Sequence, residues 1–153
     1  MNPLRPAAPD DVPVLASLYA ETARALGAWY YTKEQVAAWA SFGAATPAFA
    51  AYVLGAETWI ALDARGGPLG FSGIDDGGEV HSLYVRHDAV RGGTGSQLLA
   101  WGLERGAARG IERFAAWATP FSLPVFERAG FRLVRRVTAD FQGEMFERLR
   151  VER

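Results

Sequence analysis

The first third of the chain carries apolar residues at helical spacing. After a short predicted strand at 4–6, the recurring apolar positions are Val12, Leu15, Leu18, Tyr19 and Leu26. A repeat of three to four residues places them on one helix face, so this stretch predicts an amphipathic helix. Asp10 and Asp11 stand just before it, where short acidic side chains can cap a helix.

Two further helices are predicted before residue 55. Residues 32–35 read Thr-Lys-Glu-Gln, the pattern of a capping box, and we expect them to open a helix that runs through Val36 and Trp39. The apolar segment 49–54 follows Pro47 and predicts a third, shorter helix.

From residue 58 onward the pattern changes to short apolar runs separated by glycine-rich turns. The runs 58–62, 69–74 and 79–85 predict three antiparallel strands, with turns at 66–68 and 75–78. A helix is predicted over 95–109, with Gly110 placed to end it. The remaining segments predict a strand at 111–118, a short helix at 123–129, and a closing hairpin of strands 131–141 and 144–151.

This order of elements predicts a mixed α/β fold, with helices flanking one central sheet that is mostly antiparallel. No linker, repeat or low-complexity segment interrupts the chain. A length of 153 residues is enough to bury a core, so we expect one domain over residues 1–153.

Composition narrows the function classes. The formal net charge of -1 argues against general nucleic-acid binding, because phosphate-binding domains are usually strongly basic. The absence of cysteine excludes a catalytic thiol, a disulfide and thiolate metal ligands. No apolar run approaches the ~20 residues of a membrane span, and Asp10 and Asp11 lie where a signal peptide would be apolar. We therefore expect a cytoplasmic protein that binds neither nucleic acid nor membrane.

The glycine-rich segment 90–95, Val-Arg-Gly-Gly-Thr-Gly, lies between a predicted strand and a predicted helix. Such a loop directs free backbone N–H groups and the positive end of the helix at an anion. Two other phosphate motifs fail here. Gly95-Ser96-Gln97 lacks the lysine of a P-loop, and Leu98 stands where a dinucleotide fingerprint requires its third glycine. A nucleotide-binding module of another fold is therefore disfavoured.

Segment 83–99 resembles the cofactor pyrophosphate loop of the GNAT acetyltransferases, commonly written Q/R-x-x-G-x-G/A. Residues 124–131 resemble the second cofactor-binding stretch of that family, which ends in Gly-Phe, and the opening at 4–11 is similar to its first strand and helix. Two positions depart from the family pattern. Val90 stands where the family usually has arginine or glutamine, and Phe126 where many members have a tyrosine that protonates the leaving thiolate.

The resemblance implies a splayed sheet and acetyl-CoA as acyl donor, with an amine attacking the thioester directly. It also implies a set of cofactor-binding residues: Leu83, Tyr84, Val85, Arg91, Gly92, Gly93, Thr94, Gly95, Ser96 and Phe126. In this set the backbone near Leu83 to Val85 takes an oxyanion-type role, and the glycine loop holds the pyrophosphate.

Strand 79–85 is the richest place for catalytic groups. Its apolar residues Val80, Leu83 and Val85 are spaced by three and then two, and this break in alternation predicts a β-bulge near residue 81 or 82. Glu79 and His81 flank it and are the candidate general bases, acting directly or through water. The alternative is a solvated glutamate and a surface or satisfied histidine. No metal site is predicted, because the two histidines have no suitable carboxylate partners.

Aromatic residues gather between the first two predicted helices, the region that in the family helps to wall the acceptor pocket: Trp29, Tyr30, Tyr31 and Trp39. Such residues also suit a core, and both interpretations stay open. We take Trp29 and Tyr31 as candidate substrate-binding residues, which favours an apolar or aromatic amine.

The sequence thus predicts an N-acetyltransferase that moves an acetyl group from acetyl-CoA to a primary amine of a small molecule or peptide. The alternative is a CoA-binding module without efficient transfer, acting as a sensor or interaction protein. The acceptor's identity and the length of the acyl chain stay open, and so does a homodimer.

Overall fold

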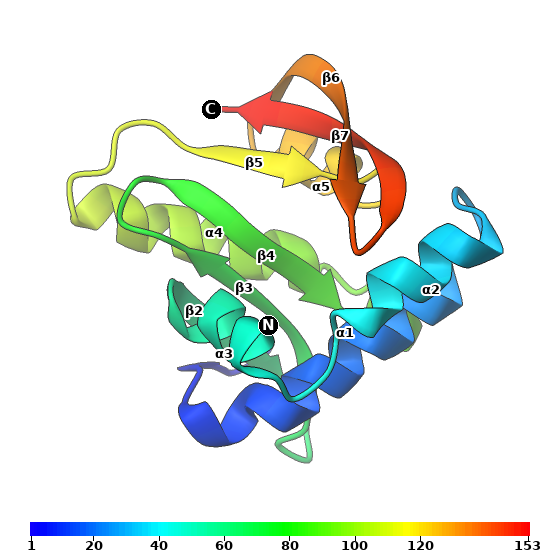
Figure 1. Cartoon of the computed structure of the whole chain (residues 1–153). Coiled ribbons are helices and arrows are strands. Elements are labelled where there is room, and N and C mark those ends of the chain that lie inside the picture. Colours follow the sequence, from blue (N-terminus) through cyan, green and yellow to red (C-terminus); the bar gives the residue numbers. More distant parts are fainter.

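Seven strands form one open sheet in the computed structural model, which describes residues 1–153 (Figure 1). Their order across the sheet is β1-β2-β3-β4-β5-β7-β6, and every neighbouring pair is antiparallel except β4 and β5. The strands are β1 (Leu4–Pro6), β2 (Glu57–Leu62), β3 (Pro68–Ile74), β4 (Glu79–Val85), β5 (Ala115–Ala118), β6 (Arg132–Phe141) and β7 (Glu144–Glu152). The predicted fold class is confirmed.

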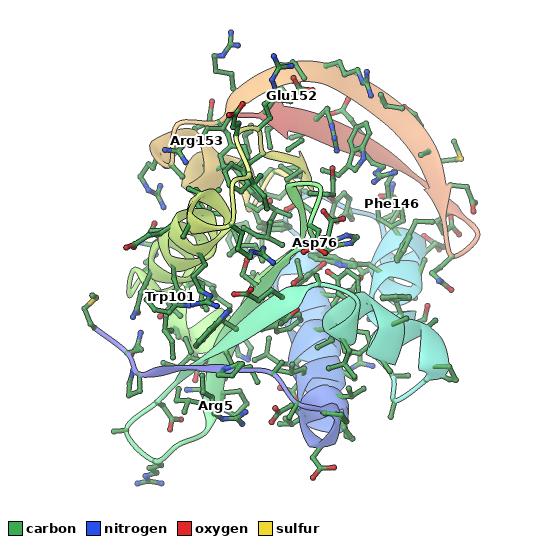
Figure 2. The ribbon with its side chains drawn as sticks, turned by 90° about the vertical axis from the view of Figure 1, so that its left-hand side faces the viewer. Arg5, Asp76, Trp101, Phe146, Glu152 and Arg153 are labelled. Carbon is green, nitrogen blue, oxygen red and sulfur yellow. The ribbon has the colours of Figure 1, made fainter.

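Helices cover both faces of the sheet, as the side view in Figure 2 shows. They are α1 (Val12–Gly27), α2 (Lys33–Ser41), α3 (Pro47–Leu54), α4 (Thr94–Ala108) and α5 (Leu123–Arg128). Two buried clusters divide the core accordingly. Helices α1 to α3 pack with Phe71 and Phe146 on one face, whereas α4 and α5 pack with Val80 and Val151 on the other.

The helix-capping predictions have different outcomes. The capping box before α2 is confirmed, because the Thr32 hydroxyl accepts from the Gln35 N–H and the Gln35 side chain accepts from the Thr32 N–H. Asp11 occupies the N-cap position of α1 as expected, but its side chain makes no capping hydrogen bond to that helix. Its carboxylate accepts instead from the Arg5 guanidinium at 2.7 and 2.8 Å and from the Ala8 N–H at 2.8 Å.

The strand predicted at 111–118 begins four residues later, at Ala115. Gly110 ends α4 with a left-handed φ of 91°, a conformation that glycine adopts without steric cost. The Ile111 N–H then bonds back to the Gly106 carbonyl, so this residue still belongs to the helix end. Regular pairing starts only where β5 meets β7.

The bulge in β4 is confirmed at His81. Gly73 pairs with Ser82 but the next residue of β3, Ile74, pairs with Val80, so His81 is the extra residue. On its other side β4 pairs with β5 only at Glu79 and Val80. Beyond this point the two strands diverge, and the sheet opens into a V (Figure 1).

Candidate active site

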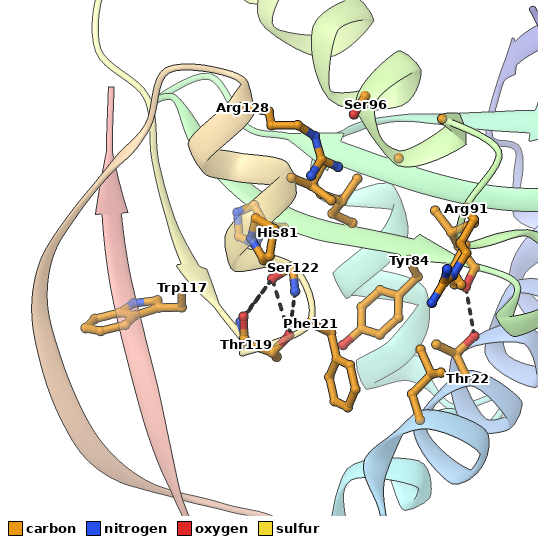
Figure 3. A pocket seen from close by; sticks show the side chains of 18 of the residues that line it. Thr22, His81, Tyr84, Arg91, Ser96, Trp117, Thr119, Phe121, Ser122 and Arg128 are labelled. Carbon is orange, nitrogen blue, oxygen red and sulfur yellow. Dashed lines mark hydrogen bonds between the residues drawn. The ribbon is translucent and has the colours of Figure 1, made fainter. Parts of the chain in front are cut away.

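Two cavities meet where β4 and β5 diverge. The larger cavity, about 800 Å³, runs from the start of α4 past α5 (Figure 3). The smaller cavity, about 430 Å³, lies toward α2 and the β6–β7 hairpin. Their shared wall consists of Trp39, Tyr52, His81, Tyr84, Trp117 and Thr119. A molecule in one cavity can therefore reach a molecule in the other at the bulge.

The glycine loop forms one end of the larger cavity. Gly93 is the N-cap of α4 and has a left-handed φ of 77°, with open space where a Cβ would stand. The first N–H groups of a helix have no intrahelical partners, so the N–H groups at the start of α4 are available to a ligand. Of the predicted loop residues, four line the cavity: Arg91, Gly93, Gly95 and Ser96.

The other two predicted loop residues do not line either cavity. Gly92 lies on the exposed outer side of the turn, and Thr94 is buried. The Thr94 hydroxyl accepts a hydrogen bond from Asn2 Nδ2 at 3.1 Å, so its side chain braces the N-terminal segment against α4. Because neither Gly92 nor Thr94 lines the larger cavity, we leave both out of the proposed cofactor site.

Arg128 of α5 is a cavity-lining cation that the sequence did not reveal. Neither it nor Arg91 takes part in an ion pair. Figure 3 draws both on the cavity wall, one from the loop before α4 and one from α5. Two free guanidinium groups beside a helix N-terminus are suited to a phosphate-bearing ligand.

The edge of β4 offers further donors. The Arg86 N–H bonds to the Leu69 carbonyl of β3 at 2.7 Å. Backbone groups alternate in an antiparallel pair, so the N–H groups of Leu83 and Val85 point away from β3 into the V. The Val85 carbonyl on that side accepts from the Thr22 hydroxyl at 3.3 Å. Both N–H groups remain directed at the larger cavity, which these two residues line.

His81 lines both cavities and is held by Asp75. Its Nε2 lies 2.7 Å from Asp75 Oδ2, and Asp75 also accepts from the N–H groups of Gly77 and Glu79. Burial alone would raise the pKa of Asp75, but these hydrogen bonds outweigh burial and hold its pKa below the usual value. Asp75 is therefore ionised at neutral pH. A hydrogen on Nε2 leaves Nδ1 as the proton acceptor.

Glu79 is engaged elsewhere. Both of its carboxylate oxygens accept from Arg150, at 2.8 and 2.9 Å. It lines only the smaller cavity. This bidentate, charge-assisted pair holds the carboxylate against Arg150.

Tyr84 stands at the junction of the two cavities. Its hydroxyl accepts from Trp39 Nε1 at 3.1 Å, and its ring stacks on Phe71. Burial raises the pKa of the Tyr84 phenol, although the hydrogen bond from Trp39 partly offsets the effect. The phenol therefore stays protonated at neutral pH and is a weaker acid than an ordinary tyrosine.

Two predicted contact residues lie outside the cavities. Phe126 is 2% exposed and packs edge-on against Phe131 in the core, so its ring does not reach the cleft. Trp29 is 78% exposed at the end of α1 and lines neither cavity. Tyr31, in contrast, lines the smaller cavity and packs against Trp39. We therefore keep Tyr31 in the proposed site and leave Phe126 and Trp29 out of it.

Residues 28–147 match the model of the GNAT acetyltransferase domain. This chain belongs to the GNAT acetyltransferase family. Its splayed sheet, bulged central strand and glycine loop before a helix agree with the resemblance seen in the sequence, and the chain is an acetyltransferase.

Solved GNAT structures are similar to the chain over nearly its whole length. A GCN5-related N-acetyltransferase from Rhodopseudomonas palustris has 29% identity and a TM-score of 0.93, covering 99% of this chain and 94% of that one. The PaiA N-acetyltransferase of Thermoplasma acidophilum, solved with coenzyme A, has 15% identity and a TM-score of 0.78, covering 99% and 98%.

A phosphinothricin acetyltransferase from Sinorhizobium meliloti, solved with AcCoA, has 22% identity and a TM-score of 0.68, covering 99% of this chain and 87% of that one. No curated protein sequence matches the chain. None of its helices has the length and apolar character needed to cross a bilayer.

Proposed function

We propose that the enzyme transfers the acetyl group of acetyl-CoA to a primary amine of a small molecule or peptide by direct attack. The observation that carries this proposal is the junction of two cavities at His81, beside the open edge of β4. One cavity has a loop and cations suited to a pyrophosphate, and the other is walled by aromatic side chains. Family membership makes the chain an enzyme, so a binding module without transfer is set aside.

The residues of the larger cavity fit acetyl-CoA. Arg91, Arg128 and the N–H groups at the start of α4 would hold the pyrophosphate, since all of them are donors without an ionic partner. The N–H groups of Leu83 and Val85 would lie along the pantetheine arm and the thioester. A donor aimed at the thioester oxygen stabilises the negative charge that develops there as the amine adds. When bound, acetyl-CoA supplies the activated acetyl group.

His81 is the proposed general base. An alkylamine has a pKa near 10.4, so producing its free base at neutral pH costs ~5 kcal/mol. His81 lies on the wall that both cavities share, whereas Glu79 is paired with Arg150. Asp75 fixes the imidazole ring through Nε2 and leaves Nδ1 to accept the proton, directly or through one water.

A thiol-release assay with acetyl-CoA across a panel of amines tests the proposal. We expect thiol release with at least one primary amine. His81→Asn should then lower kcat/KM by ~10²- to 10⁴-fold while CoA affinity stays constant, as removal of a general base does. Glu79→Gln tests the other candidate. His87→Asn is the matched control, because His87 is exposed and lines neither cavity.

The outcomes separate cleanly. No thiol release with any amine, from protein that still binds acetyl-CoA, would contradict amine transfer. Near-normal turnover of His81→Asn at every pH would remove His81 as the base. A large loss in Glu79→Gln alone would transfer that role to the glutamate.

A further inference from the structure

Arg148 is an unpaired cation on the wall of the smaller cavity. It is half-buried, takes part in no ion pair, and places its guanidinium carbon 4.3 Å from the centre of the Trp117 ring. Stacking on an indole holds the charged group in place but leaves its hydrogen-bond donors unused. Arg148 thus presents free, oriented donors to whatever occupies this cavity.

The other charges around this cavity are already balanced. Glu79 pairs with Arg150, Glu147 with Arg136 and Asp75 with His81. The exception is Asp140, an exposed residue opposite Met145. Met145 lies three residues before Arg148 on β7, which corresponds to ~10 Å along a strand. Asp140 is therefore at the hairpin end of the cavity and does not neutralise Arg148.

Burial and the neighbouring Arg150 lower the pKa of Arg148, and Glu79 offsets only part of this effect. The residue remains protonated, because arginine titrates far above neutral pH. A half-buried cation of this kind favours an anionic partner. The nearby carboxylate of Glu79 is already engaged by Arg150, so we expect the partner to be part of the ligand.

Apart from Arg148 and the polar residues Glu79, His81, Thr119, Asp140 and Glu147, the wall of the cavity is apolar. Aromatic rings of Tyr31, Trp39, Phe42, Phe141 and Phe146 line it, and several of them pack edge to face. A volume of about 430 Å³ suits a small molecule. The acceptor site thus combines an aromatic wall, one free guanidinium and, at the bulge, the proposed base.

We propose that the acceptor is an amino carboxylate with an apolar or aromatic side chain, whose carboxylate is bound by Arg148. The amine then lies at the junction beside His81, and the side chain lies against the aromatic wall. This inference rests on the proposed amine transfer and narrows its acceptor from any primary amine to one class. Arginine suits this role because its planar fork can bind a carboxylate through two hydrogen bonds.

The test compares acids with their uncharged counterparts. Acetyl transfer is measured to L-phenylalanine, L-phenylalaninamide, L-leucine, L-leucinamide and 2-phenylethylamine, with wild-type enzyme and with Arg148→Gln. The acid and its amide differ in the basicity of the amine. The informative quantity is therefore the acid-to-amide ratio of kcat/KM, compared between the wild type and each variant.

We expect Arg148→Gln to reduce this ratio by ~10- to 100-fold, since a hydrogen bond to a charged group is lost only for the acids. Arg148→Lys keeps the charge without the fork and should give an intermediate ratio. Arg132→Gln is the matched control, an exposed arginine of β6 outside both cavities, and should leave the ratio unchanged. Unchanged CoA affinity shows that each variant is folded.

Two results would overturn the inference. One is an unchanged acid-to-amide ratio in Arg148→Gln, which includes an equal loss for acids and amides. The other is transfer to uncharged amines with none to either acid. Both leave amine transfer itself intact. Absence of transfer to every amine would instead contradict the proposed function, and with it the inference.

Discussion

Gly93 offers a direct test of the proposed pyrophosphate site. Its backbone conformation predicts how a substitution changes stability, and its location predicts how the substitution changes CoA affinity. Its φ of 77° lies in the left-handed region, and a Cβ built on it meets nothing within 4 Å. An alanine there incurs the left-handed penalty of ~1–2 kcal/mol. Alanine also lowers the conformational entropy of the unfolded chain, which stabilises the folded state by ~0.4–1 kcal/mol. We expect Gly93→Ala to lower the free energy of unfolding by about 1 kcal/mol.

The same methyl group should weaken CoA binding by more than the stability change explains. It would occupy the open space at the mouth of the helix, where a pyrophosphate must approach the backbone closely. We expect a loss of affinity of at least ~10-fold, or ~1.4 kcal/mol. A change of 1 kcal/mol in stability moves Tm by only ~2–4 °C in a chain of this length, so the variant stays folded during the binding assay.

Gly92→Ala is the matched control. Its φ is outside the left-handed region, its added Cβ would lie 3.5 Å from the Ala89 carbonyl oxygen, an ordinary contact, and it lines neither cavity. We expect a stability change within ~0.5 kcal/mol and almost unchanged CoA affinity. Urea unfolding and titration calorimetry measure both quantities. If Gly93→Ala loses the expected stability but binds CoA as tightly as the wild type, the pyrophosphate lies elsewhere.

Two further changes test the donor side. Arg128→Gln should weaken CoA binding by about tenfold and reduce the dependence of that affinity on salt, because one phosphate contact is lost. Titration calorimetry at two ionic strengths measures both effects. An unchanged salt dependence would contradict a phosphate contact by Arg128. Phe126→Tyr should raise turnover by less than ~100-fold and lower the free energy of unfolding by ~1–3 kcal/mol, since the added hydroxyl enters a core position that is 2% exposed. A gain well above that bound in the thiol-release assay would show that the enzyme lacks an essential acid.

Much of the fold was predictable because local patterns and tertiary packing agree. The three-and-two spacing of Val80, Leu83 and Val85 located the bulge, since one extra residue shifts which face each later side chain takes. The late start of β5 was not predictable in this way. Ile111 and Phe114 suit a strand that continues into the apolar run after them, but Ile111 completes the end of α4.

The site was predictable only where it depends on one segment. The glycine loop is a continuous stretch, and most of it lies as expected. Arg148 was missed because alternating charges on β7 are typical of a solvated face. The divergence of β4 from β5 turns part of that face into a cavity, and no local pattern indicates which arginine then keeps a partner. Arg150 of β7 is paired with Trp117 of β5 and forms an ion pair with Glu79, whereas Arg148 forms no ion pair.

In the proposed reaction, deprotonating the amine costs more free energy than expelling the thiolate, and the site provides a proposed base for the more costly step. Deprotonating an alkylammonium at neutral pH costs ~5 kcal/mol, whereas a thiol with a pKa near that of cysteine, ~8.5, can leave as its anion for ~2 kcal/mol. The more costly side has His81, oriented by Asp75. On the other side Phe126, in the place of the family's tyrosine, contributes a ring to the core and no proton. A base on the amine side, without a tyrosine at position 126, is therefore consistent with acetyl transfer to an amine.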